Sequence, residues 1–410
     1  MYYITEPLWE IAVNVMPLAN RRQVLAGVSL TLASVPVSVL AKEGMMFASD
    51  KAARADEWAR EFADRIAAPA ISLAVANGDG SLWQAAFGRA DIEMNVAAMP
   101  GHTFRLGSVS KVLTTTAAAR LATRGKVDLD APISSYMPDL PEQHRATTLR
   151  QLLTHRGGIR HYQPADFAWD GPGAPVHMRR YLNDADRLAP FIDDPLIGQP
   201  GEKVSYSSYG YTLASIAMQE ADGRHFLQIL AEEIATPFGM DSLDGDDPLA
   251  IVKDRAHGYV TASEMPMLFG PDEAAWPKME GDFANAPWLD QSYCWAGAGM
   301  RANAADVARF GAGVLDAPDS PLKEAERTLL FTPLTQADDR NPPLGLGWRV
   351  DKDAKDRRRW HHAGSTPGGR ASLVVFPDAG LSIAICSNVM TAPGNVLEPS
   401  GELLEIFTRT

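Results

Sequence analysis

Hydrophobic and polar residues recur along this chain in patterns that predict a sheet assembled from its two ends. Near the N-terminal end the pattern predicts an amphipathic helix at 51–66, a strand at 70–76 and, after an Asn-Gly-Asp-Gly turn, a second strand at 81–87. Towards the C-terminus the pattern predicts strands at 344–350, 360–363, 371–376 and 381–387, followed by a closing helix at 397–407. Strands this far apart in the chain need a long insertion between them.

The middle of the chain differs in composition: it is rich in Pro and Asp and has few runs in which apolar and polar residues alternate. Short helices are predicted there at 149–155, 211–221 and 226–235, and residues 241–290 read mainly as loop. Strand character resumes near 296–301, and a helix follows at 304–315. We therefore predict an α/β (α+β) fold, an antiparallel sheet flanked by helices, with one lobe from 50–130 and 295–410 and a mainly helical lobe from 131–294.

The first 41 residues resemble an export signal. Arg21 and Arg22 precede an apolar run from Val24 to Leu40, and a small residue, Ala41, ends a cleavage-like sequence. The pair of arginines is similar to the twin-arginine type, which predicts an exported, periplasmic or secreted mature chain without stable membrane insertion. A plain membrane anchor is the alternative, although the run is short and contains Ser and Pro. Translation from either Met1 or Met16 fits the pattern.

Composition and charge exclude some classes of partner. The chain has 410 residues, 46% of them hydrophobic, and a net charge of −13, which disfavours nucleic acid and anionic membrane surfaces. Its two cysteines, Cys294 and Cys386, have no zinc-like spacing and form no disulfide framework. Cys386 lies in a predicted core strand, so we expect a buried free thiol there. Oligomeric state cannot be read from the sequence.

The candidate chemistry centres on Ser108 and Lys111. Thr103–Leu106 reads as a short strand, and a helix of small and apolar residues begins at Ser108. A spacing of three residues puts both side chains on one helix face, where the lysine amine can accept the serine proton. A second Ser-x-x-Lys, Ser320 to Lys323, reads as an ordinary helix N-cap because Pro321 follows the serine.

Three other stretches carry candidate residues. Tyr206 follows a Pro-Gly turn and could relay a proton, although a packed tyrosine with a hydrogen-bonded hydroxyl is the simpler interpretation. His361 and His362 precede a glycine-rich turn and alternate in a strand, so only one of them can face a site. His155, at a helix end before two glycines, is most simply a structural hydrogen-bonding residue.

Together these motifs resemble the serine β-lactamase/penicillin-binding-protein superfamily, in its class C, esterase-like branch. The similarity runs from about residue 65 to residue 405 and rests on several stretches, each short but specific in combination. These are Leu106-Gly-Ser-Val-Ser-Lys111, Leu152-Leu-Thr-His155, Pro200-Gly201 through Tyr206, Thr236-Pro-Phe-Gly-Met240, Ala298-Gly-Met-Arg301 and His362-Ala-Gly-Ser-Thr-Pro-Gly368.

The resemblance implies a role for each of these residues. Ser108 resembles the acylated nucleophile, Lys111 its proton acceptor and Tyr206 the tyrosine of the Tyr-x-Asn element. The backbone N–H groups of Ser108 and Ser365 would then form the oxyanion hole. No metal or organic cofactor is implied.

Two positions depart from the family pattern and bear on substrate choice. Ser208 stands where the family has an asparagine that contacts acylamino side chains, and His362-Ala363-Gly364 stands where it has Lys-Thr-Gly. Both changes weaken recognition of an anionic amide substrate and leave the acylation residues in place.

The resemblance therefore implies a serine hydrolase that acts through an acyl-enzyme, with carboxylesterase-type hydrolysis of small esters as the leading expectation. A β-lactamase or D-alanyl-D-alanine peptidase is the alternative, and a non-enzymatic penicillin-recognising relative is disfavoured by the retained Ser108, Lys111 and Tyr206. A Ser-His-Asp esterase is disfavoured because the chain lacks Gly-x-Ser-x-Gly, its nearest approach being Gly380 to Ala384 in a predicted strand.

Overall fold

The computed structural model describes residues 46–167, 175–270, 272–337 and 342–409. The predicted export segment, residues 1–41, lies outside them. Among the described residues, no helix combines the length and the apolar character needed to cross a membrane.

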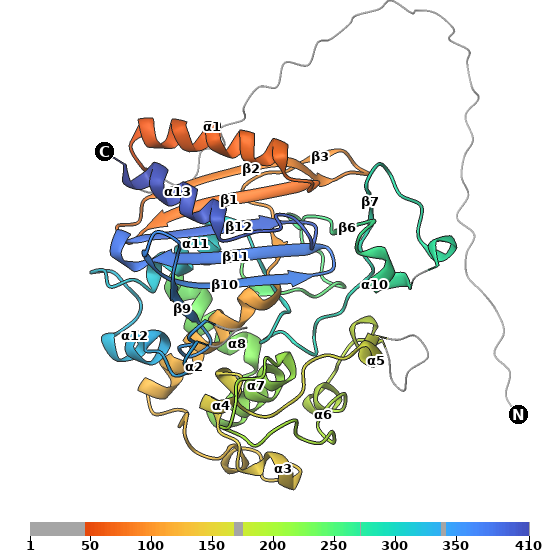
Figure 1. The fold of residues 1–410 in the computed structure, drawn as a ribbon. Coiled ribbons are helices and arrows are strands. Elements are labelled where there is room, and N and C mark those ends of the chain that lie inside the picture. The colour runs from red at the N-terminus through yellow and green to blue at the C-terminus, as the bar shows by residue number, and fades with distance from the viewer. Residues whose placement is uncertain (1–45, 168–174, 271, 338–341, 410) are drawn as a thin grey trace, which may run out of the picture. The chain divides into compact units, whose positions relative to one another are not determined.

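A seven-stranded antiparallel sheet, built from the two ends of the chain, organises the fold (Figure 1). Strand β1 pairs with β12, so that Ile71 lies opposite Ser387, and this pair joins the N-terminal strands to the C-terminal ones. The strand order is β3 (Val96–Ala97), β2 (Leu82–Asp91), β1 (Ala70–Asn77), β12 (Leu381–Ser387), β11 (Gly369–Phe376), β10 (Arg358–Thr366) and β9 (Arg349–Lys352). The predicted fold class is confirmed.

Helices cover both faces of this sheet. On one face, α1 (Ser49–Arg65) and α13 (Glu398–Thr408) pack on a core that includes Trp83 and Phe376 (Figure 1). On the other, α11 (Ala304–Gly313) lies against β1 and β12. The central strands β1 and β12 are buried along nearly their whole length because both faces of the sheet are covered there.

Helix α2 (Ser110–Thr123) follows the Ser108 turn and is buried on almost every side, with Val112, Ala117 and Leu121 in the same core as α11. It contacts α12 (Glu324–Phe331) and α7 (Ser208–Asp222). A helix buried all round needs small and apolar side chains, and α2 has them.

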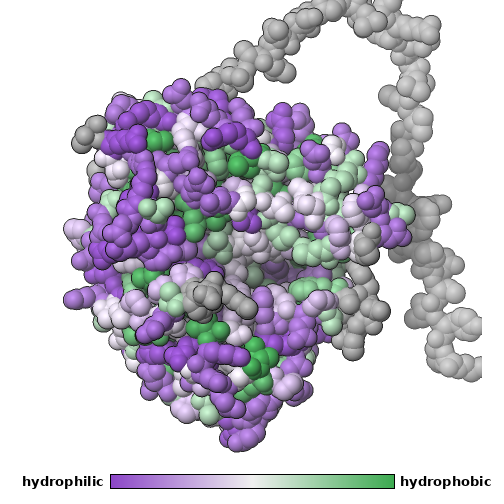
Figure 2. Space-filling view, in the orientation of Figure 1, coloured by the Kyte–Doolittle hydropathy of each residue, from purple (hydrophilic) through white to green (hydrophobic). Residues whose placement is uncertain are grey.

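Apart from α7, the inserted part of the chain consists of short elements. Its helices are α3 (Glu142–Arg145), α4 (Leu149–Leu153), α5 (Pro164–Phe167), α6 (Asp184–Leu188), α7, α8 (Phe226–Leu230), α9 (Thr236–Phe238) and α10 (Met265–Phe269). Two small sheets accompany them: β4 (Phe104–Arg105) with β8 (Met300–Ala302) and β5 (Asp244–Gly245), and β6 (Tyr259–Thr261) with β7 (Phe283–Asn285). On the face shown in Figure 2, hydrophobic residues form small groups among hydrophilic ones.

The structure corrects several predicted elements. The strand predicted at 344–350 is mostly a turn closed by the Gly345 N–H to Trp348 carbonyl bond, and β9 begins only at Arg349. Ser320 is not a helix N-cap: α12 begins at Glu324, and the Ser320 hydroxyl instead donates to the Gly313 carbonyl. Residues 241–290 are mainly loop, as predicted, with three short strands and α10 among the described residues.

Candidate active site

Ser108 lies in a single 3₁₀ turn, Gly107–Val109, between β4 and α2. Gly107 has φ +50°, and a methyl group there would lie 2.6 Å from the Ser365 nitrogen, so both the conformation and the space favour glycine. The Ser108 side chain is half-buried. The turn therefore presents the hydroxyl beside the start of α2 and leaves it within reach of solvent.

Lys111 is fully buried one turn beyond the serine. Its Nζ donates to Ser108 Oγ at 3.2 Å, to Ser208 Oγ at 3.0 Å and to the Gly297 carbonyl at 2.6 Å. The ammonium also lies 4.8 Å from the Tyr206 ring centroid. No carboxylate of the described chain forms an ion pair with it. Three oxygen acceptors and an aromatic face thus hold the Lys111 amine beside the nucleophile.

Tyr206 is, with Lys111, the other residue that hydrogen-bonds to the Ser108 hydroxyl. Its phenol donates to Ser108 Oγ at 2.7 Å, and its ring packs 4.3 Å from the His155 ring. Burial by itself would raise the pKa of Tyr206, but the Lys111 charge and the hydrogen bonds with Lys111 and Ser108 outweigh it, so this pKa lies below its ordinary value. A phenol poised in this way can carry a proton to and from the serine.

Ser208 begins α7 and is buried. Its hydroxyl is already engaged by Lys111, and its backbone N–H donates to His161 Nδ1 at 3.2 Å. His161 is half-buried, and its ring meets the Tyr206 ring edge-on at 5.2 Å. The residue in the asparagine position therefore accepts a hydrogen bond from the lysine and has no side-chain amide for a substrate.

His362 on β10 is buried and neutral. Its Nδ1 lies 2.7 Å from the Ala363 carbonyl, which can only accept, so this nitrogen carries the proton. Burial, followed by the nearby charges of Arg349 and Lys111, holds the pKa of His362 well below its usual range. His361, on the opposite face of the strand, points its Nε2 at Asp351, 3.2 Å from the carboxylate. Only His362 thus shares the surroundings of Lys111, as alternation along the strand predicts.

The end of β10 lies directly against the nucleophile turn. Gly364 pairs with Ala371 of β11, and a methyl group on Gly364 would lie 2.5 Å from the Ser108 nitrogen. Thr366 pairs with Gly369 across a two-residue turn, and this pair is hydrogen-bonded. Hydrogen-bonded and non-hydrogen-bonded pairs alternate along an antiparallel ladder, so the N–H of the exposed residue Ser365 points away from β11. Strand β9 pairs only with Arg358–His361, so it does not reach Ser365. The Ser108 and Ser365 N–H groups are therefore neighbours on the open side of the turn.

Comparison with known proteins identifies the family. A model named Beta-lactamase matches residues 55–403, which is most of the chain. The chain belongs to the beta-lactamase family. This confirms the superfamily inferred from the motifs.

The chain also resembles curated relatives in sequence and a solved structure in fold. The chain is 24% identical over 405 residues to the mitochondrial serine beta-lactamase-like protein LACTB of Mus musculus, covering 77% of this chain and 70% of the relative. It is 23% identical over 324 residues to penicillin-binding protein 4* of Bacillus subtilis, covering 77% and 67%. The D-amino acid amidase of Ochrobactrum anthropi matches the fold with a TM-score of 0.69 at 20% identity, covering 85% of this chain and 95% of the amidase.

The beta-lactamase-family site also contains groups that reasoning from sequence missed. The Gly297 carbonyl holds Lys111, yet a backbone oxygen leaves no sequence signal of its own. His161 was not identified either, although it follows the recognised Leu152–His155 motif by only a few residues. His155 matches its structural interpretation: its Nδ1 accepts the Ser207 N–H at 3.2 Å.

Proposed function

We propose that this beta-lactamase-family protein is a serine hydrolase that acts through an acyl-enzyme, with small carboxylic esters as its substrates. One observation carries the proposal: the Ser108 hydroxyl oxygen receives hydrogen bonds from Tyr206 at 2.7 Å and from Lys111 at 3.2 Å. A serine hydroxyl flanked by two groups that can exchange protons is an activated nucleophile.

The geometry supports the following mechanism. Tyr206, reacting as a phenolate stabilised by the neighbouring Lys111 ammonium, takes the Ser108 proton as Oγ attacks the ester carbonyl carbon. The N–H groups of Ser108 and Ser365 stabilise the oxyanion that forms, a contribution typically worth ~10²–10³ in rate for each donor. Tyr206 then protonates the departing alkoxide, and water hydrolyses the acyl-enzyme with the same residues acting in reverse.

Two features favour an ester over a β-lactam. Because residue 208 is a serine whose hydroxyl oxygen accepts from Lys111, no side-chain amide is available at that position for an acylamino group. The neutral state of His362 leaves no cation at the lysine position to attract a substrate carboxylate. An activated ester needs only the nucleophile, its proton acceptors and the oxyanion hole that are proposed above.

The deciding experiment compares kcat/KM for p-nitrophenyl butyrate with that for a chromogenic cephalosporin on purified protein. We expect ester hydrolysis to be faster by at least about tenfold, since each lost polar contact costs ~1–3 kcal/mol in a buried site. Intact-mass spectrometry should detect an acyl adduct on Ser108. A cephalosporin value equal to the ester value would refute the esterase proposal in favour of a β-lactamase.

Amide hydrolysis is the second candidate, and the fold similarity to the D-amino acid amidase and to a D-stereospecific amidohydrolase from Streptomyces favours it. Amino acid amides and p-nitroanilides of both configurations test this candidate in the same assay. Amide turnover that exceeds ester turnover would move the proposal to this class.

We also propose that the protein is exported, on the evidence of Arg21 and Arg22 before the apolar run to Leu40. Replacing both arginines by lysine should leave the precursor in the cytoplasm, detected by cell fractionation. An unprocessed cytoplasmic chain in the wild type would contradict this proposal.

A further inference from the structure

His161 lies inside the site but takes no part in the proposed proton transfers. Its ring meets the Tyr206 ring edge-on at 5.2 Å and stacks on the Tyr162 ring at 4.6 Å. Burial, followed by the charge of Lys111, lowers the pKa of His161 to about 4. His161 is therefore a neutral ring at neutral pH, fixed against the residues that surround the nucleophile.

The hydrogen bond from Ser208 decides which nitrogen of this ring carries its proton. The Ser208 N–H donates to Nδ1 at 3.2 Å, so Nδ1 is the acceptor and the proton of the neutral ring is on Nε2. Nε2 has no hydrogen-bond partner in the described chain, and it is not among the polar atoms shut off from solvent. The ring thus presents an unused N–H donor on the solvent side of the site.

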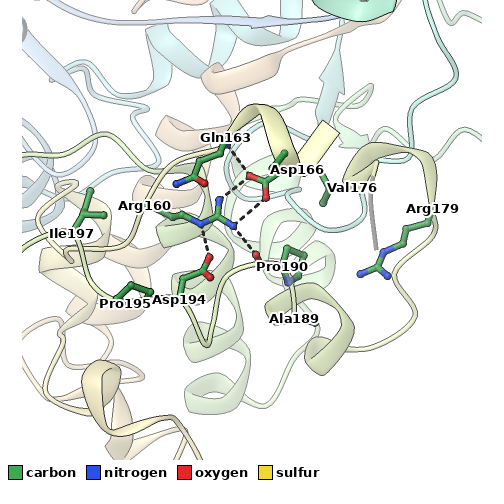
Figure 3. A pocket seen from close by; sticks show the side chains of 11 residues that line it. Arg160, Gln163, Asp166, Val176, Arg179, Ala189, Pro190, Asp194, Pro195 and Ile197 are labelled. Carbon is green, nitrogen blue, oxygen red and sulfur yellow. Dashed lines mark hydrogen bonds and ion pairs between the residues drawn. The ribbon is translucent and has the colours of Figure 1, made fainter. Parts of the chain in front are cut away.

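Ion pairs and hydrogen bonds of the neighbouring residue Arg160 hold the segment that carries His161. Arg160 forms ion pairs with Asp166 and Asp194 and donates to the Pro190 carbonyl at 2.8 Å, as Figure 3 shows. The Arg160 carbonyl in turn accepts from the Ser207 hydroxyl at 2.8 Å. Arg160, Asp166, Pro190 and Asp194 line a neighbouring pocket of about 630 Å³, whose lining does not include His161 itself. A donor on such a scaffold is pre-organised for binding.

We propose that His161 is a specificity-determining residue, which donates its Nε2–H to an acceptor oxygen on the acyl part of the substrate. The substrate class is then an ester or amide whose acyl group carries a carbonyl oxygen near the reacting carbon, such as an acylamino acid derivative. His161 supplies a side-chain N–H donor in a part of the chain next to Ser208, whose side chain has no N–H of its own. This inference rests on the proposed acyl-enzyme function.

Two p-nitrophenyl esters that differ in one group test the proposal: the propionate, and N-acetylalanine in each configuration, which adds an acetamido group to the same acyl chain. The readout is the ratio of kcat/KM for the acetamido ester to that for the propionate, so that effects common to both substrates cancel. His161→Asn keeps an acceptor for the Ser208 N–H and lacks the outer donor. His161→Gln places an amide N–H near the position of Nε2.

We expect His161→Asn to lower this ratio about five- to twentyfold, through KM more than kcat, and His161→Gln to recover part of the loss. His177→Asn is the matched control. His177 is another half-buried histidine whose pKa burial lowers to about 4, and it makes no contact with Ser208 or Tyr206. The control should leave the ratio unchanged. Unfolding temperatures of all three variants establish that folded proteins are compared.

Several outcomes would overturn the inference. A ratio that stays within twofold of wild type in His161→Asn, or equal losses on both esters, would mean that His161 only supports the fold. A loss of the same size in His177→Asn would have the same meaning. These failures are distinct from failure of the proposed function, which would show as undiminished turnover of the propionate in Ser108→Ala.

Discussion

The close contact between the end of β10 and the nucleophile turn can be tested by adding one methyl group. In Gly364→Ala, the new carbon would lie 2.1 Å from the Leu106 carbonyl oxygen and 2.5 Å from the Ser108 nitrogen. Both neighbours are backbone atoms, so no side-chain rotation relieves the overlap. Because carbon atoms stay beyond about 3 Å from such atoms, the two segments must separate by roughly 1 Å.

That separation moves apart the two N–H groups that we propose as the oxyanion hole, because one belongs to each segment. A misplacement of about 1 Å in an active site costs roughly 10²-fold in rate. We therefore expect kcat/KM for p-nitrophenyl butyrate to fall about a hundredfold in Gly364→Ala. Overpacking of this kind also lowers the free energy of unfolding by about 1–3 kcal/mol, so the assay is run well below the unfolding temperature of the variant.

Gly101→Ala is the matched control for this experiment. Nothing lies within 4 Å of the methyl position at Gly101, and its backbone does not have the positive φ that disfavours alanine. The control should keep both activity and stability. A fully active Gly364→Ala protein would refute the reasoning, because it would show that the backbones of β10 and the nucleophile turn do not meet as described. If Gly101→Ala lost activity as well, the loss in Gly364→Ala could not be attributed to overlap between β10 and the nucleophile turn, and the reasoning would be refuted.

Three other predictions follow from the same site. Ser108→Ala should abolish both turnover and the acyl adduct, and Lys111→Ala should cost nearly as much because the residues act as a unit; normal turnover in either variant means that the nucleophile is wrongly assigned. Ser208→Asn should raise cephalosporin acylation, measured by the rate of adduct formation, and an unchanged rate would contradict the role given to this position. Since burial holds the pKa of His362 well below its ordinary 6.5, the unfolded chain binds a proton there that the folded chain does not. Stability from this residue is complete above pH 6.5 and is lost as the pH falls, so chemical unfolding at about pH 7.5 and about pH 5 should show a decrease that His362→Gln reduces.

Sequence patterns predicted much of the fold because the relevant signals are local. Strand β12 begins and ends where the apolar run from Leu381 to Ser387 does, and the Asn-Gly-Asp-Gly turn joins two paired strands. The serine and lysine share a helix face because three residues make nearly one turn, which depends on no other part of the chain. The prediction of a strand at 344–350 was mostly wrong, because Gly345 and Gly347 favour a turn that the spacing of apolar residues does not reveal.

Only the tertiary structure decided how the site works. Lys111 is 97 residues from Ser208 and 186 from Gly297, and these contacts exist because α7 and the loop before β8 pack against α2. Periodicity reports which face of a helix is buried, but it carries no information about which distant atom meets that face. The same limit concealed His161, whose tautomer and open nitrogen depend on a backbone N–H at the start of α7. The sequence alone thus pointed to the pair of Ser108 and Lys111, while long-range packing decided which other groups surround that pair.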